Sequence, residues 1–93
     1  MSIVVRFRPK NMTAAQYDDA VRRHEAAGVE FPPDGLDYHV CFGSEGNLVV
    51  SEIWDSREQL EAYGKRLMPL LADAGIELSG EPEILEVHSI TKR

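Results

Sequence analysis

The order of hydrophobic periodicities along the chain limits the possible folds more than any other feature of the sequence. Apolar residues recur at every second position in four segments, which predicts β-strands, and at helical spacing in two others. The expected order is strand, helix, strand, strand, helix, strand, over residues 2–8, 13–28, 36–42, 48–54, 56–75 and 84–90. This order is typical of a ferredoxin-like α+β fold, βαββαβ, with a four-stranded antiparallel sheet and both helices on one face.

Both helical segments carry recognisable start signals. Thr13 and Gln16 have the spacing of a capping box, and Ser56 and Gln59 repeat that spacing before the second helix. Pro69 falls inside the second segment, where the loss of a backbone donor predicts a kink or an interruption. The sequence therefore predicts two amphipathic helices, the second of them irregular.

A glycine-bearing segment, residues 43–47, joins the second and third strands and predicts a hairpin loop. If the loop is centred on its middle residue, Val40 pairs with Val50 and His39 with Ser51. A slip of one residue would change every partner, so this register is the least constrained part of the predicted sheet.

Two helices on one face of a four-stranded sheet leave the other face bare. The alternate strand residues on that face include several large apolar side chains, and an exposed apolar sheet normally marks an association surface. We therefore expect the chain, a single domain over residues 1–93, to form a homodimer in which two sheets pair face to face as a dimeric α+β barrel.

The composition excludes several classes of function. Sixteen acidic residues against ten basic ones give a net charge of −6, which lacks the basic footprint that nucleic-acid binding requires. No segment has the length and apolarity of a membrane span or of a secretory signal. Cys41 is the sole cysteine, so we expect a reducing, cytoplasmic location and no cysteine-rich metal site.

His39 and His88 are the candidate catalytic residues, because both lie on predicted strands and an imidazole titrates near neutral pH. Their strands should occupy opposite edges of the sheet, so the two rings are expected to be far apart in one chain and closer across a dimer. The alternative for each is a structural role, with the ring bonded to the backbone or to a neighbouring side chain. His24, on the flank of the first helix, is expected to be a surface or boundary residue.

The candidate substrate-binding residues are Trp54 and Tyr63. Trp54 belongs to the segment Trp54-Asp55-Ser56, where the third strand meets the second helix, and Tyr63 lies on the apolar stripe of that helix. Each aromatic ring can line a pocket and offer one polar atom to a ligand, or can simply pack in the core. Glu52 and Glu86 are each in line with apolar strand neighbours, where a carboxylate can act as a base. Edge positions or salt bridges to Arg6 and Arg8 on the first strand are the alternative.

The order of elements and a set of local motifs together resemble the dimeric α+β barrel superfamily. This superfamily includes antibiotic-biosynthesis monooxygenases, haem-degrading monooxygenases and stress-responsive barrel proteins. The resemblance covers nearly the whole chain in topology, and its sharper part consists of His39, Gly46, Trp54-Asp55-Ser56, Glu58, Leu67-Met68-Pro69, Gly75, Pro82 and His88.

The resemblance implies that Trp54 belongs to a pocket between the helices and the sheet. The helical histidine that ligates haem in the haem-degrading members falls at about Tyr63, and the asparagine that those enzymes carry on the first strand has no counterpart in residues 2–8. These two departures argue against haem and imply a cofactor-free or ligand-binding barrel.

Two functions from different classes follow. The first is an enzyme acting on a small aromatic or polyketide-like molecule, either as a cofactor-independent monooxygenase or as a cyclase or isomerase, with His39 or His88 moving the proton. The second is a non-catalytic small-molecule-binding or stress-related dimer whose pocket residues only pack. The fold hosts both kinds of function and cannot choose between them.

Overall fold

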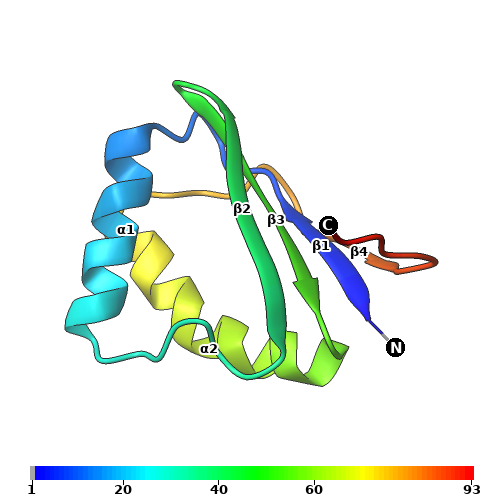
Figure 1. Ribbon diagram of the computed structural model, residues 1–93. Coiled ribbons are helices and arrows are strands. Elements are labelled where there is room, and N and C mark those ends of the chain that lie inside the picture. The colour runs from blue at the N-terminus through cyan, green and yellow to red at the C-terminus, as the bar shows by residue number, and fades with distance from the viewer. Residues whose placement is uncertain (1) are drawn as a thin grey trace.

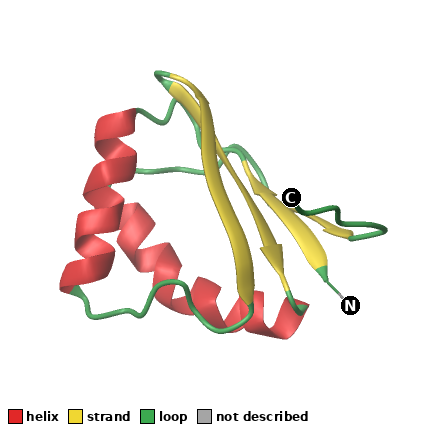
Figure 2. Cartoon of the chain, viewed as in Figure 1, coloured by secondary structure: helices red, strands yellow, loops and turns green. Residues whose placement is uncertain are grey.

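The computed structural model describes residues 2–93 and has the expected order of elements. They are β1 (Ile3–Phe7), α1 (Ala14–Ala26), β2 (Leu36–Ser44), β3 (Asn47–Trp54), α2 (Arg57–Asp73) and β4 (Glu83–Glu86). The strands form one antiparallel sheet in the order β2-β3-β1-β4, and both helices cover the same face of it (Figures 1 and 2). The ferredoxin-like α+β fold predicted from the sequence is confirmed.

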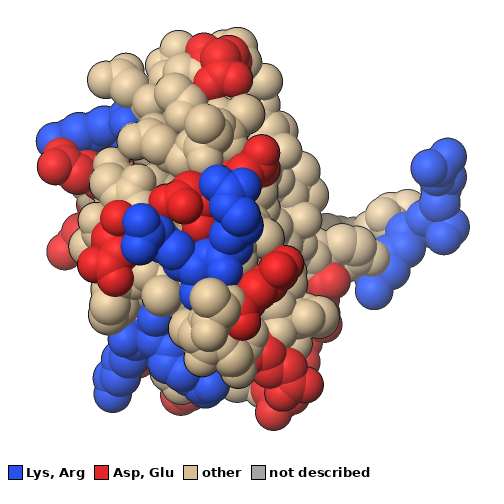
Figure 3. Space-filling model, turned by 90° about the vertical axis from the view of Figure 1, so that its left-hand side faces the viewer, with Lys and Arg blue, Asp and Glu red and all other residues tan. Residues whose placement is uncertain are grey.

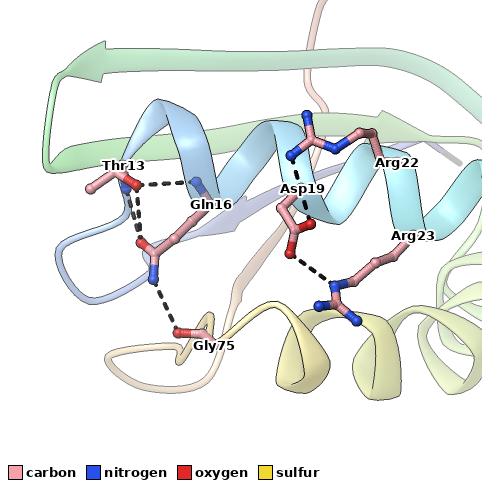
Figure 4. A network of polar contacts seen from close by, with 6 residues as sticks. All are labelled: Thr13, Gln16, Asp19, Arg22, Arg23 and Gly75. Carbon is pink, nitrogen blue, oxygen red and sulfur yellow. Dashed lines mark hydrogen bonds and ion pairs between the residues drawn. The ribbon is translucent and has the colours of Figure 1, made fainter.

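The start of α1 is fixed by the predicted capping box. The Thr13 hydroxyl accepts a hydrogen bond from the backbone N–H of Gln16 at 3.1 Å, and the Gln16 side chain accepts one from the backbone N–H of Thr13 at 3.0 Å. The Gln16 amide also donates to the carbonyl oxygen of Gly75 at 3.3 Å, which ties the start of α1 to the segment after α2 (Figure 4). The Thr13 and Gln16 side chains thus cap the start of α1, and Gln16 also links it to the segment that follows α2.

Replacing Thr13 by alanine is expected to lower the free energy of unfolding by about 1 kcal/mol, because the cap is lost while the rest of the helix is unchanged. A urea titration measures this as a lower midpoint with an unchanged slope. Thr91→Ala, in the exposed C-terminal segment, serves as the control. An unchanged midpoint in Thr13→Ala would show that the cap contributes nothing to stability.

The second helix is bent rather than broken. Ser56 caps it, accepting a hydrogen bond from the backbone N–H of Gln59, and the helix runs through Pro69 to Asp73. Figure 1 shows α2 changing direction partway along its length. Because Pro69 has no N–H to donate to the preceding turn, a bend is the expected response.

The register of the β2–β3 hairpin differs from the prediction by one residue. The strands stay paired up to Ser44 and Asn47, so the turn contains only Glu45 and Gly46, and Gly46 adopts a φ of 81°. A two-residue turn places the centre of the hairpin half a residue further along the chain than a five-residue loop does. His39 therefore faces Glu52 rather than Ser51, on the sheet face that the helices cover.

The last strand is shorter than predicted and ends at Glu86. Within residues 2–93 it pairs with β1 alone, and the strand pairing ends where Ile3 meets Glu86. One further backbone bond, from Val87 N–H to Ser2, closes the ladder. His88 was predicted to lie on this strand, but it follows the strand and is exposed.

The core between the helices and the sheet consists of two groups of buried residues. The larger group centres on Trp54 and Val5, which are completely buried, together with Ile3, Leu36, Leu60 and Tyr63. A second group, made of Met12, Val50 and Ile76, closes the opposite end of the layer. The space between these groups is only partly filled by side chains.

The face of the sheet away from the helices is apolar and bare. Tyr38, Val40, Phe42 and Leu85 project from it, and Val40 is 50% exposed. The bare face predicted from the sequence is therefore confirmed.

On the helix side, by contrast, acidic and basic side chains are mixed over the surface (Figure 3), and the ion pairs of Asp19 with Arg22 and Arg23 belong to this region (Figure 4). In residues 2–93, no helix is long and apolar enough to cross a membrane.

Candidate functional site

A cavity of about 540 Å³ lies between the two helices and the sheet. Its size is in the range of small-molecule sites, and most of its lining is apolar. The polar side chains on its walls come from α1 and from the two strands nearest α1: Tyr17, His24, Glu25, His39 and Glu52. A few polar groups in an apolar cavity are the usual arrangement for orienting a ligand.

Four of the polar side chains in and behind this wall form a continuous chain of hydrogen bonds. The Tyr17 hydroxyl lies 2.8 Å from Nε2 of His39, and Nδ1 of His39 lies 2.6 Å from Oε2 of Glu52. The other carboxylate oxygen of Glu52 accepts a hydrogen bond from the indole N–H of Trp54 at 3.0 Å. The chain thus runs from the cavity wall into the core, where the side chain of Glu52 is only 3% exposed.

The hydrogen bonds of Glu52 determine the tautomer of His39, that is, which of its ring nitrogens carries the proton. A carboxylate only accepts, and one of its oxygens is already occupied by the Trp54 indole, so Nδ1 of His39 carries the proton that Oε2 receives. In the neutral ring Nε2 is then an acceptor, and Tyr17 donates its hydroxyl proton to it. This tautomer is assigned from the network, and it leaves His39 with its basic nitrogen toward the cavity.

A second imidazole and phenol pair lies in the same layer. Nε2 of His24 is 2.6 Å from the hydroxyl of Tyr63, and both residues are buried. The ring of Phe31 meets the His24 ring and the His39 ring edge-on, with centroid distances of 5.5 and 5.4 Å. Phe31 therefore connects the two pairs, and its ring is half exposed at the surface.

Burial sets the protonation of these groups. It lowers the pKa of His24, which keeps that imidazole neutral at pH 7. Burial also raises the pKa of Tyr63, and it raises the pKa of Tyr17 with a smaller contribution from the charge of Glu52. Both phenols thus keep their protons at neutral pH and are available as donors.

The stability of the protein is expected to fall as the pH drops below about 6.5, the ordinary pKa of a histidine. Since the pKa of His24 is lower in the folded state, the unfolded chain binds the proton first, and stability present above that pH is lost below it. The slope for this one group is on the order of 1 kcal/mol per pH unit at most. Urea titrations of the parent and His24→Gln at pH 7 and pH 5 measure it.

The glutamine variant should lose less stability than the parent over that interval, because its amide can still bond Tyr63 and does not titrate. His39 and His88 are present in both proteins, so their contributions cancel in the comparison. An equal loss in the two proteins would contradict the neutral, buried state of His24.

The structure brings three of the four predicted site residues together. His39 lines the cavity, whereas Trp54 and Tyr63 lie behind the wall and reach it through Glu52 and His24. The rings of Trp54 and Tyr63 are in contact, with centroids 5.6 Å apart. His88, exposed beyond β4, is outside the cavity lining, so the structure does not bring the two predicted bases together.

Sequence reasoning missed Tyr17 and placed His24 wrongly. Tyr17 is not among the site residues predicted from the sequence, and His24 is predicted to be a surface or boundary residue, although only 7% of it is exposed. The two residues are seven apart, which puts them on one face of α1, and that spacing was the available signal. Across residues 2–93, no three His, Cys, Asp or Glu side chains gather into a cluster suited to a metal ion.

Comparison with known proteins identifies the fold. No protein-family model and no curated protein sequence matches the chain. Among solved structures, SnoaB, a cofactor-independent oxygenase from Streptomyces nogalater, is similar over 99% of this chain and 98% of its own, with a TM-score of 0.67 and 13% identity.

Two further structures show the same likeness. A putative antibiotic biosynthesis monooxygenase from Deinococcus radiodurans matches 100% of this chain and 98% of its own (TM-score 0.59, 14% identity). A haem-degrading protein from Mycobacterium tuberculosis matches 99% of this chain and 100% of its own (TM-score 0.56, 17% identity). The chain therefore has the fold of the antibiotic-biosynthesis-monooxygenase-like proteins, as the resemblance in its sequence implied.

Proposed function

We propose that the protein is an enzyme that removes a proton from a small, largely apolar molecule held in the cavity, with His39 as the base. The observation that carries this proposal is the hydrogen-bonded chain from Tyr17 through His39 and Glu52 to Trp54. A buried carboxylate that fixes the tautomer of an imidazole is the arrangement by which enzymes orient a general base.

Tyr17 gives the proton a path. Its oxygen can accept a proton from the ligand while its own proton moves to Nε2 of His39, because the hydroxyl already donates in that direction. The raised pKa of Tyr17 disfavours a free phenolate, so the two transfers occur together rather than through a charged tyrosine. Glu52 then stabilises the imidazolium that forms.

The ligand anion left by this step has two possible fates. In the oxygenase form, molecular oxygen is the oxidant: a ring CH₂ becomes C=O, the second oxygen atom leaves as water, and the substrate supplies all the electrons. In the isomerase or cyclase form, the anion is reprotonated or closes a ring without oxygen. The similarity of the fold to a protein described as a cofactor-independent oxygenase favours the first form.

We also propose that two copies pair through the bare sheet face. The exposed Tyr38, Val40, Phe42 and Leu85 make this face too apolar for a surface that stays in water. A second copy would bury it on both sides and complete a barrel, which is the simplest closed assembly for a face of this kind.

The proposed activity is tested by screening phenols, ring ketones and quinone-like compounds for oxygen uptake and absorbance change, with parent protein, His39→Gln and Tyr38→Phe. Turnover by the parent and by Tyr38→Phe, with loss in His39→Gln, is expected. Tyr38 is a suitable control because it lies on the bare sheet face, away from the cavity. Compounds that bind to the parent without any turnover would contradict catalysis and support the non-catalytic binding function.

The catalytic role of His88 stays a prediction, which the same assay tests. A His88→Gln variant that loses turnover while His39→Gln keeps it would transfer the role of the base to His88 and contradict the proposal. If only His39→Gln loses turnover, the proposal stands and His88 has no part in the reaction.

A further inference from the structure

The His24 and Tyr63 pair has no part in the proton transfer described above, yet it belongs to the same cavity. His24 lines the cavity, and Tyr63 stands behind it. The pair is more deeply buried than His39, whose side chain is 22% exposed. Their mutual hydrogen bond satisfies the Tyr63 hydroxyl and one ring nitrogen of His24, and the other ring nitrogen, Nδ1, needs a partner of its own.

The hydrogen bond to Tyr63 fixes the tautomer of His24. The Tyr63 hydroxyl has one hydrogen-bond partner within the described part of the chain, Nε2 of His24, and its proton has no other acceptor there. Tyr63 therefore donates, Nε2 accepts, and in the neutral ring the remaining proton is on Nδ1. Nδ1 is then a donor without a partner in residues 2–93.

This unpaired nitrogen is accessible. In residues 2–93, every fully buried side-chain nitrogen or oxygen has a hydrogen-bond partner. Nδ1 of His24 has no hydrogen-bond partner, so it is not one of these fully buried atoms. It therefore keeps some accessible surface, which a small molecule can contact. We infer that this molecule is a ligand or water in the cavity, because His24 is one of the cavity-lining residues.

The position of His24 relative to the proposed base defines a distance that a ligand would span. Tyr17 and His24 are seven residues apart on α1, which puts them on one face and about 10.5 Å apart along the helix axis. The Phe31 ring is nearly perpendicular to both imidazole rings, with its centroid 5.5 Å from that of His24 and 5.4 Å from that of His39. The cavity lining therefore includes two imidazoles and the apolar Phe31 ring, which is close to both of them.

We propose that His24 is a ligand-positioning residue whose Nδ1–H donates a hydrogen bond to an oxygen acceptor on the ligand, at the end remote from the proton that His39 removes. The assignment of a reacting end of the ligand to His39 depends on the proposed function, whereas the contact with His24 does not depend on it. The cavity would therefore select molecules that carry a carbonyl or similar neutral oxygen over equally shaped molecules without one.

A neutral acceptor fits the charges around His24 better than an ion does. Glu25 and Glu52 also line the cavity and would repel a carboxylate or phosphate. His24 itself is neutral because burial lowers its pKa, so it adds no positive charge to hold an anion. A cation would leave the Nδ1–H donor without an acceptor.

The test compares two bicyclic probes of nearly the same shape, 1-tetralone, which has a carbonyl group, and tetralin, which has none. Isothermal titration calorimetry on the parent should show that 1-tetralone binds about three- to tenfold more tightly than tetralin, which is the effect of one hydrogen bond. The preference should disappear in the double variant His24→Phe/Tyr63→Phe and remain in His39→Gln.

The double variant keeps two rings of similar size and leaves no polar atom unpaired, so it is expected to fold even if a single replacement does not. Nitrogen-15 NMR of the parent gives a second measurement: the His24 ring should have its proton on Nδ1, and that signal should shift with 1-tetralone and not with tetralin. A preference for 1-tetralone that survives in the double variant, or that disappears only in His39→Gln, would overturn the role of His24.

These outcomes are distinct from failure of the proposed reaction. One outcome is that no compound is turned over, while the parent prefers 1-tetralone and the double variant does not. That result would support the binding role of His24 and contradict catalysis by His39. If the parent binds both probes equally, the binding role of His24 falls regardless of any turnover.

Discussion

Replacing Glu52 by glutamine is expected to reduce turnover by about 10²- to 10⁴-fold while the fold is retained. The Trp54 indole N–H needs an acceptor, so the glutamine carbonyl oxygen takes the place of Oε1. Its NH₂ group then faces Nδ1 of His39, where it can only donate. Nδ1 must lose its proton to accept, and the proton moves to Nε2. The basic nitrogen that faces Tyr17 becomes a donor, and the path for the proton is closed.

The effect should be mainly on kcat, since Glu52→Gln changes neither the volume nor the apolar lining of the cavity. The measurement is kcat and KM on any substrate that the screen identifies, with circular dichroism to compare the folds. Glu61→Gln, an exposed residue of α2, removes the same charge elsewhere and should behave as the parent. Full activity in Glu52→Gln would show that the carboxylate does not set the tautomer of His39.

Replacing Val40 by glutamate is expected to convert the proposed dimer into a monomer. Val40 is central on β2, opposite Ser51, and half exposed on the bare sheet face. Pairing two sheets would bury a carboxylate from each copy in an apolar interface, and an unpaired buried charge costs several kcal/mol. Each chain already carries a net charge of −6, which gives the new carboxylates no compensating field.

Light scattering at micromolar concentration measures this change. The parent should have about twice the chain mass of 10.4 kDa, and Val40→Glu should have the chain mass itself. Ala62→Glu adds the same charge at an exposed position of α2 and should leave the dimer intact. A parent of 10.4 kDa would disprove the dimer, and a dimeric Val40→Glu would place its interface on another surface.

The fold could be predicted from the sequence because each element carries its own local signal. Alternation in four segments, the Thr13 and Ser56 caps and the glycine turns all agree, and together they leave one topology. The hairpin register was wrong because it depends on a turn of two residues rather than five, a difference that composition does not determine. The end of β4 was wrong because its length is set by β1, not by its own alternating pattern.

The candidate site was only partly predictable for the same reason. His39 stood out by residue type, but its partner Glu52 is revealed only by the correct register, and a slip of one residue replaces it with Ser51. Tyr17 and His24 have the periodicity of packing residues, and the pattern does not show that the space beside them is unfilled. Which apolar stripe encloses a cavity depends on the fit of side chains from three separate elements.

The bonds at the start of α1 have a mechanical consequence. Besides its cap and the link from Gln16 to Gly75, this end is held by a backbone bond from Leu48 to Met12 and by the Glu45 carboxylate, which accepts from Ala14. The other end continues into residues 27–35, which carry the half-exposed Phe31 ring beside both imidazoles. The start of α1 is thus tied to more neighbouring segments than its end, so we expect the cavity to widen at residues 27–35, and the backbone amides in the last turn of α1 to exchange faster than those in its middle turn.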